Sequence, residues 1–158
     1  MNPHVRRRAT AFLCFVLLTA AVSAQTGDKY TVRLGMVPAA NGTQQVLVAG
    51  KGAATATLAG NKLTVNGTFE GLPAPATAAR LHQGVAKGAR GKAFADLTST
   101  KAASGTITGS VTLTPEQVDA LKAGKIYMQV HSEKGIAPEQ GKADAIVDNS
   151  NLWGWLLK

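Results

Sequence analysis

Short runs of the chain alternate apolar and polar residues with a period of two. The clearest examples are KLTVNGTF at 62–69 and TITGSVTL at 106–113. Such alternation is typical of strands that bury one face and expose the other. Another strand-like run at 53–58 precedes the first example, and the turn-forming residues AGN at 59–61 between them predict a hairpin.

Five more segments have the threonine and valine enrichment of strands. Glycine, proline and asparagine separate the runs at spacings of roughly 10 to 15 residues, which is typical of one antiparallel sandwich or barrel. These segments are 30–36, 76–82, 92–97, 125–132 and 142–147.

The segment Thr114–Gly124 (TPEQVDALKAG) departs from this pattern. It has an N-cap threonine, a proline in the first turn, a glutamine three residues after the cap and a closing glycine, which together predict a short helix at about 115–123. The predicted fold is therefore all-β, an antiparallel immunoglobulin-like β-sandwich or Greek-key barrel with one short inserted helix.

The N-terminal region has the pattern of a signal peptide. A basic stretch, Arg6–Arg8, precedes the apolar run AFLCFVLLTAAV at 11–22, and small residues follow at Val22 and Ala24. The apolar run is shorter than the about 20 residues that a membrane-spanning helix requires. We therefore expect cleavage after Ala24, delivery to the periplasm or secretion from the cell, and no transmembrane segment after processing.

Cleavage would change both the redox chemistry and the charge of the working protein. Cys14 is the one cysteine of the chain and would be removed, so disulfides and thiolate chemistry are not expected. Loss of the three arginines leaves 14 basic and 9 acidic residues, and a net charge of +5 in place of +8. Lys87, Arg90 and Lys92 form one denser basic stretch among glycines, which we interpret as a solvated loop, with no nucleic-acid partner.

The expected division of the chain is a signal peptide at 1–24, one β domain at 25–148 and a tail at 149–158. The tail (NSNLWGWLLK) contains both tryptophans, and Trp153 and Trp155 lie at the spacing that places them on one face of a strand. Two interpretations stay open: a terminal strand that packs on the core, or an exposed anchor for a partner protein or a membrane surface.

Two histidines remain after processing, His82 and His131. On a strand over 125–133 His131 shares a face with Glu133, and on the strand that ends at His82 the neighbouring Arg80 points the same way. If these strands are adjacent, His82, His131 and Glu133 could form a two-imidazole, one-carboxylate site for zinc, copper or iron. The alternative is that both histidines belong to a buried hydrogen-bonded network.

The sequence lacks the common motifs of catalysis. It has no G-x-S-x-G and no HExxH, and the glycines before Lys92 do not form a phosphate loop, because Ala86 and Ala93 stand where glycine and a hydroxyl are required. We therefore expect a protein that is not an enzyme and has no cofactor, unless a transition metal binds the histidines.

Several segments in order resemble the CHRD domain, the module named from chordin and common in exported bacterial proteins. They are ATATLAGNKLTVNGTFEGLPAPATAARLHQG, GKAFADL and GTITGSVTLTPEQVDALKAGKIYMQVHSEKG, and the resemblance spans about Tyr30–Val147. It implies an immunoglobulin-like sandwich or barrel and a strand-end histidine at His131. Family members usually carry His-x-His where this chain has RLH at 80–82, and Gly-Glu-x-Arg-Gly where it has PEQGKADA at 138–145.

The leading hypothesis is an exported, non-catalytic β module that binds or scaffolds a protein or another envelope component through Trp153, Trp155 and Arg80. The alternative is a metal-binding periplasmic protein that uses His82 and His131. A third hypothesis is small-ligand binding in the mouth of a barrel.

Overall fold

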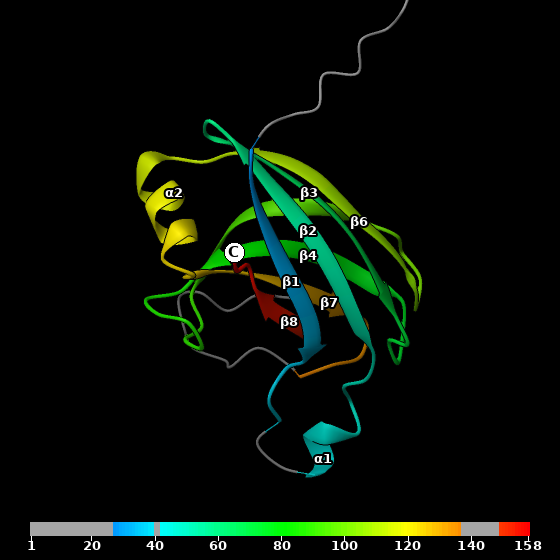
Figure 1. The fold of residues 1–158 in the computed structure, drawn as a ribbon. Coiled ribbons are helices and arrows are strands. Elements are labelled where there is room, and N and C mark those ends of the chain that lie inside the picture. Colours follow the sequence, from blue (N-terminus) through cyan, green and yellow to red (C-terminus); the bar gives the residue numbers. More distant parts are fainter. Residues whose placement is uncertain (1–26, 40–41, 137–148) are drawn as a thin grey trace, which may run out of the picture.

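Eight strands close into an antiparallel barrel in the computed structural model, which describes residues 27–39, 42–136 and 149–158 (Figure 1). The all-β prediction and the inserted helix are confirmed, while the signal peptide and the strand predicted at 142–147 lie outside the described residues. Among the described residues, both helices are too short and too polar to cross a bilayer. The elements are β1 (Asp28–Met36), α1 (Gly42–Gln45), β2 (Lys51–Ala59), β3 (Lys62–Glu70), β4 (Ala76–Gln83), β5 (Lys92–Ser99), β6 (Gly105–Thr112), α2 (Pro115–Lys122), β7 (Ile126–Ser132) and β8 (Asn149–Trp155).

Around the barrel the strands follow the order β1-β2-β3-β6-β5-β4-β7-β8, and β8 pairs with β1 to close it. Long ladders join the strands within two halves, β1-β2-β3-β6 and β5-β4-β7-β8. The two seams between the halves are short. One joins β5 to β6 at Thr98↔Thr108 and Ser99↔Ile107, and the other joins β1 to β8 at Gly35↔Trp153 and Met36↔Leu152.

The predicted hairpin is β2 and β3, which pair from Lys51↔Glu70 to Ala59↔Lys62. Gly60 in the turn has a φ of 61°, a conformation that favours glycine. The alternation read from the sequence places side chains correctly, because Leu63 and Val65 are both 0 % exposed.

Helix α2 begins with the predicted capping box. The Thr114 side chain accepts a hydrogen bond from the Gln117 backbone at 3.3 Å, and the Gln117 side chain accepts one from the Thr114 backbone at 2.9 Å. Leu121 of the helix is buried in the barrel core. Helix α2 therefore covers one end of the barrel, and α1 lies beyond the opposite end (Figure 1).

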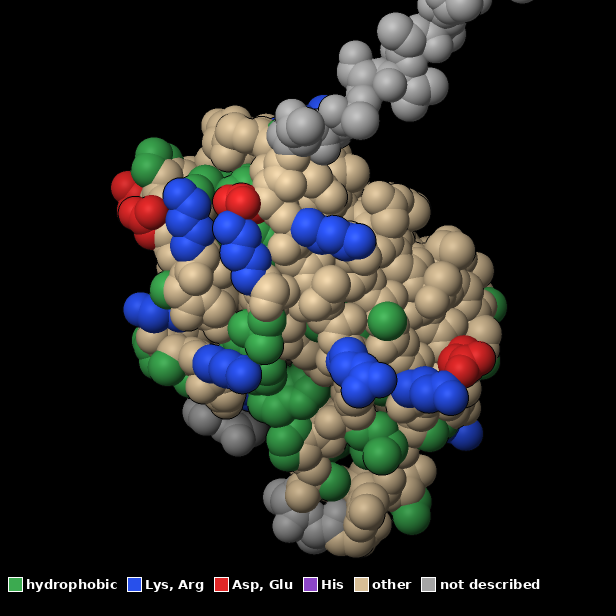
Figure 2. Space-filling view, in the orientation of Figure 1, with side chains coloured by type: hydrophobic (Ala, Val, Ile, Leu, Met, Phe, Trp, Pro, Cys, Tyr) green, Lys and Arg blue, Asp and Glu red, His purple; other side chains and the backbone are tan. Residues whose placement is uncertain are grey.

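Every strand contributes to one core cluster. Strands β1, β2, β3, β4 and β7 each supply several inward-facing side chains, and β5, β6 and β8 supply Leu97, Ile107 and Leu152. The outer face of β1, β2, β3 and β6 is instead polar, with Thr31, Thr55, Asn66 and Thr108 aligned in a row across the four strands. Figure 2 views the molecule from the side of β1 and shows lysines and arginines standing singly or in pairs over that surface. This half of the barrel has the ordinary pattern of a core-facing side and a solvated side.

Candidate functional site

The other half of the barrel does not follow that pattern, because the outer face of β7 is buried as well as the inner one. Every residue of β7 is buried. A strand of a small barrel normally exposes its outer side chains, so a face that is polar and yet covered indicates a site. The inward side chains are Ile126, Met128 and Val130, and the outward ones are Tyr127, Gln129 and His131, as the alternation predicts.

Strand pairing brings these outward side chains beside both tryptophans and the second histidine. His82 of β4 lies opposite Tyr127, which in turn lies opposite Trp155 of β8. In the next row Gln129 lies opposite Trp153. We refer to His82, Tyr127, Gln129, His131, Trp153 and Trp155 as the histidine–tryptophan cluster.

The rings of the cluster are in continuous contact. His82 stacks on Tyr127 with ring centroids 4.8 Å apart, and Tyr127 stacks on Trp155 at 5.0 Å. Trp153 meets Trp155 edge-on at 4.7 Å. Such contacts stabilise ring positions beyond the burial of area alone, so the cluster is a rigid surface rather than a set of independent side chains.

The loop at 84–91, between β4 and β5, folds back onto the cluster. The Gly91 N–H donates to the Tyr127 hydroxyl at 3.1 Å, and that hydroxyl donates to the Gly91 carbonyl at 3.2 Å. The Arg90 guanidinium lies 5.4 Å from the ring centroid of Trp153, within the range of a cation–π contact. A Cβ on Gly91 would lie 2.6 Å from the Gln83 carbonyl carbon, so only glycine permits this close approach.

The sequence predicted this loop to be solvated, and Lys87 is indeed exposed. Arg90 and Gly91 are the residues that this interpretation missed, because their contacts are with strands distant in the sequence. The closely spaced glycines of the loop were the available signal, since glycine permits the backbone to approach a neighbouring strand.

Three buried polar nitrogens of the cluster have no hydrogen-bond partner among the described residues. They are Nε2 of His82, Nε2 of Gln129 and Nε1 of Trp155. Leaving a buried polar atom unsatisfied costs about 1–3 kcal/mol, and native proteins contain few such atoms. Three on one sheet face indicate that a further polar group belongs to the site.

The structure brings some of the predicted site residues together and separates others. His82 and His131 have ring centroids 6.2 Å apart, and both side chains are fully buried. Glu133 does not join them, because the chain leaves β7 after Ser132, the Glu133 N–H donates to the Pro75 carbonyl, and the Glu133 side chain is exposed. Within the described part of the chain, no group of three histidine, cysteine, aspartate or glutamate side chains could hold a metal.

Arg80 and the tail also have defined places. Arg80 Nε lies 2.8 Å from Asp96 Oδ1, across the β4–β5 pair. The tail is strand β8 of the barrel, with Leu152 and Leu156 in the core and both tryptophans partly buried on the outer face. The backbone of the tail is therefore a terminal strand packed on the core, as the first of the two interpretations states. The two tryptophans retain some exposed surface.

The family model of the CHRD domain matches residues 30–139, which is more than half of the chain. The chain belongs to the CHRD domain family. Comparisons with curated proteins and with solved structures gave no match.

The match to the CHRD model ends before β8, which supplies both tryptophans of the cluster. His82, Tyr127, Gln129 and His131 lie within the matched region. The histidine–tryptophan cluster of this CHRD protein thus combines strands inside the match with a strand that follows it.

We expect the free energy of unfolding of this CHRD domain to fall as the pH drops below about 6.5. Burial lowers the pKa of His82 below its ordinary value of 6.5, the hydrogen bond to Gly91 acts in the opposite direction, and the charges of Arg80 and Arg90 lower the pKa further. As the pH falls, the unfolded chain therefore binds a proton at His82 before the folded chain does. The free energy of unfolding decreases over the range between the pKa of His82 in the unfolded chain and its lower pKa in the folded chain. The slope from one such group is at most about 1.4 kcal/mol per pH unit.

Urea unfolding measured at several pH values between about 7.5 and 5.5 checks this expectation. His82→Gln should have a flatter dependence on pH than the natural chain, whatever its absolute stability. Equal slopes for the two proteins would contradict it.

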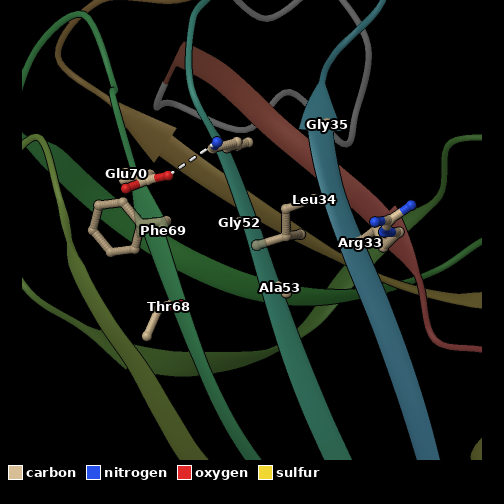
Figure 3. Close-up of a pocket in the computed structure, with 9 residues that line it drawn as sticks. Arg33, Leu34, Gly35, Gly52, Ala53, Thr68, Phe69 and Glu70 are labelled. Carbon is tan, nitrogen blue, oxygen red and sulfur yellow. Dashed lines mark ion pairs between the residues drawn. The ribbon is translucent and has the colours of Figure 1, made fainter.

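A separate hollow lies on the outer side of the barrel at the ends of β1, β2 and β3, with a volume of about 640 Å³ (Figure 3). Its polar groups are Arg33, Thr68 and the exposed ion pair of Lys51 Nζ and Glu70 Oε1 at 3.3 Å. Leu34 and Phe69, which also line it, belong to the barrel core. Because Lys51 and Glu70 neutralise each other and none of these groups is a buried unsatisfied atom, we place the candidate site at the histidine–tryptophan cluster.

Proposed function

We propose that this CHRD domain is an exported, non-catalytic module that binds a protein or another component of the cell envelope. The contact surface would be formed by Trp153 and Trp155 of the histidine–tryptophan cluster together with Arg90, which lies over the Trp153 ring. The observation that carries the proposal is the joint presence of two partly exposed tryptophans and an arginine over one of their rings.

Tryptophan and arginine are enriched among the residues that dominate the binding energy of protein interfaces. Such residues are most effective when the free protein already holds them in the bound geometry, since little side-chain entropy is then lost on binding. The edge contact between Trp153 and Trp155 and the position of Arg90 meet this condition. Arg80, the arginine expected from the sequence, is instead engaged with Asp96, so Arg90 replaces it in the proposed surface.

Export is supported by the signal-peptide pattern of residues 1–24, and the absence of catalytic sequence motifs supports a binding role. The protein would act in the periplasm or outside the cell, where a rigid surface patch can serve as a docking point. The moderate net charge of +5 after cleavage, spread over scattered side chains, favours a partner recognised by shape and aromatic contact over nucleic acid.

Site-specific photo-crosslinking in living cells tests this proposal. A photoreactive residue at the exposed position 87, beside the proposed surface, should give a discrete crosslinked species, and the same residue at position 108, on the polar face of β6, should not. The species should disappear when Arg90→Ala is added, because the guanidinium is exposed and its removal leaves the core intact. Equal crosslinking from both positions, or none from position 87, would overturn the proposal.

A further inference from the structure

The two histidines of the cluster are close enough to share one small ligand. His82 on β4 and His131 on β7 come from neighbouring antiparallel strands, where His131 lies opposite Ala78 and His82 lies opposite Tyr127. On this sheet face the Arg80↔Gln129 pair lies between their positions, and the two side chains approach each other along the strands, so that their ring centroids are 6.2 Å apart with ring planes tilted by 33°. Both side chains are 0 % exposed, so a ligand between them would be shielded from water.

The protonation state of His82 is set by the loop at 84–91. Nδ1 of His82 lies 3.1 Å from the Gly91 carbonyl oxygen. A carbonyl oxygen only accepts hydrogen bonds, so Nδ1 carries the proton and Nε2 carries a lone pair. Nε2 is buried without a hydrogen-bond partner among the described residues. A histidine that donates one ring N–H to a backbone carbonyl and keeps the other nitrogen free is the arrangement common among metal ligands.

The separation of the two ring centroids matches one coordination geometry better than another. A metal–nitrogen bond is about 2.0 Å, and the nitrogen of a five-membered ring with bonds of about 1.35 Å lies about 1.2 Å from the ring centre. Two imidazoles on opposite sides of one ion therefore have centroids about 6.4 Å apart, and two at a tetrahedral angle about 5.2 Å apart. The observed 6.2 Å is close to the first value.

The surroundings select the charge of the ion. Zinc prefers four ligands in structural sites, whereas no third histidine, cysteine, aspartate or glutamate joins the two imidazoles within the described part of the chain. Arg90 and Arg80, the latter paired with Asp96, both act electrostatically on His82, and positive charge nearby repels a doubly charged ion more strongly than a singly charged one. Imidazole is a good ligand for copper, and monovalent copper is a closed-shell ion that is stable with two nitrogens in line.

We propose that His82 and His131 bind one monovalent copper ion between them, on the outer face of β4 and β7. Tyr127, stacked on His82 and hydrogen-bonded to Gly91, would act as a positioning residue that holds the ring and the loop together. Copper binding at this place does not depend on the proposed partner surface, since it requires neither tryptophan nor Arg90 as a ligand. It gives a role to the unsatisfied nitrogen of His82.

Competition with a chromophoric copper(I) chelator under anaerobic conditions tests the proposal. The processed chain from Gln25 onward, which lacks Cys14 and is purified metal-free and without any partner, should take up one copper(I) per chain. His82→Asn and His131→Asn should each weaken binding by at least about 100-fold, because one imidazole cannot replace two. Glu133→Gln, at the exposed carboxylate that follows β7, should leave the affinity unchanged.

X-ray absorption of the copper-loaded natural chain gives a second measurement that needs no variant, and it remains decisive if a histidine variant fails to fold. The expected spectrum has two imidazole nitrogens per copper. Absence of copper(I) binding, three or four ligands in the spectrum, or unchanged affinity in a folded His82→Asn variant would overturn the proposal. Because no partner is present, failure of copper binding is distinguishable from failure of the crosslinking experiment.

Discussion

A chain shortened by residues 149–158 should fail to fold cooperatively. The removed segment contains β8, which pairs with β7 over six residue pairs and with β1 at the seam. Its loss would take Leu152 and Leu156, both 0 % exposed, out of the core and would leave two strand edges unpaired. Truncating one buried leucine to alanine costs about 2–5 kcal/mol, and a whole domain is stable by only about 5–15 kcal/mol.

Urea unfolding followed by circular dichroism checks this expectation. The shortened chain should show no cooperative transition and should bind a dye that reports exposed apolar surface. A matched control lacks only Lys158, whose ammonium pairs with Asp28 in an exposed ion pair at 2.7 Å, and it should unfold as the natural chain does. A shortened chain with an unchanged urea midpoint would show that β8 is an appendage rather than the closing strand.

Gly154→Ala should lower the free energy of unfolding by about 3 kcal/mol, because the new methyl group would be forced against the β1 backbone. A Cβ at this position would overlap the Arg33 carbonyl oxygen and lie 2.6 Å from Cγ2 of Val32. Backbone hydrogen bonds of Thr31 with Leu157 and of Val37 with Asn151 hold the two segments together on either side, so the strands cannot separate freely to admit the methyl. For a domain of this size we expect a Tm lower by about 10 °C.

Gly35→Ala provides the matched control for this change. Gly35 lies at the same seam, opposite Trp153, but a Cβ there meets nothing within 4 Å. Its Tm should stay within about 2 °C of the natural value, since exposed substitutions usually change stability by less than about 0.5 kcal/mol. If Gly35→Ala and Gly154→Ala lowered the Tm equally, the close packing of β8 on β1 would not be the reason for glycine at position 154.

Local features of this fold were readable from the sequence because they depend on neighbouring residues. The capping box of Thr114 and Gln117 forms within one turn of helix, so its four-residue pattern is sufficient to predict it. The period of two over 62–69 directs Leu63 and Val65 inward by the geometry of the strand alone. The same rule correctly assigned Tyr127, Gln129 and His131 to one face of β7.

The candidate site was predictable only in part. The alternation of the strand predicted that Glu133 lies on the same face as His131. That prediction requires the strand to continue to residue 133, but β7 ends at Ser132. The Glu133 N–H donates to the Pro75 carbonyl, and the chain turns away from β7. Arg90 and Gly91 reach the cluster through a loop whose path depends on the surface it covers. A contact between this loop and the strands leaves no periodic pattern in the sequence, because the contacting residues are distant from one another along the chain.

The sequence by itself indicated strands β1 to β7, the start of helix α2, the inward faces of β3 and β7, and the family. Only the tertiary structure decided that β6 lies beside β3, that β8 closes the barrel against β1, and that the loop at 84–91 lies against Tyr127 and Trp153. The physical reason is that strand type follows from short-range sterics and amphipathicity, whereas strand order follows from long-range pairing among many candidates of similar local character. The histidine–tryptophan cluster is a product of that order, because its side chains meet only when β4, β7 and β8 are neighbours.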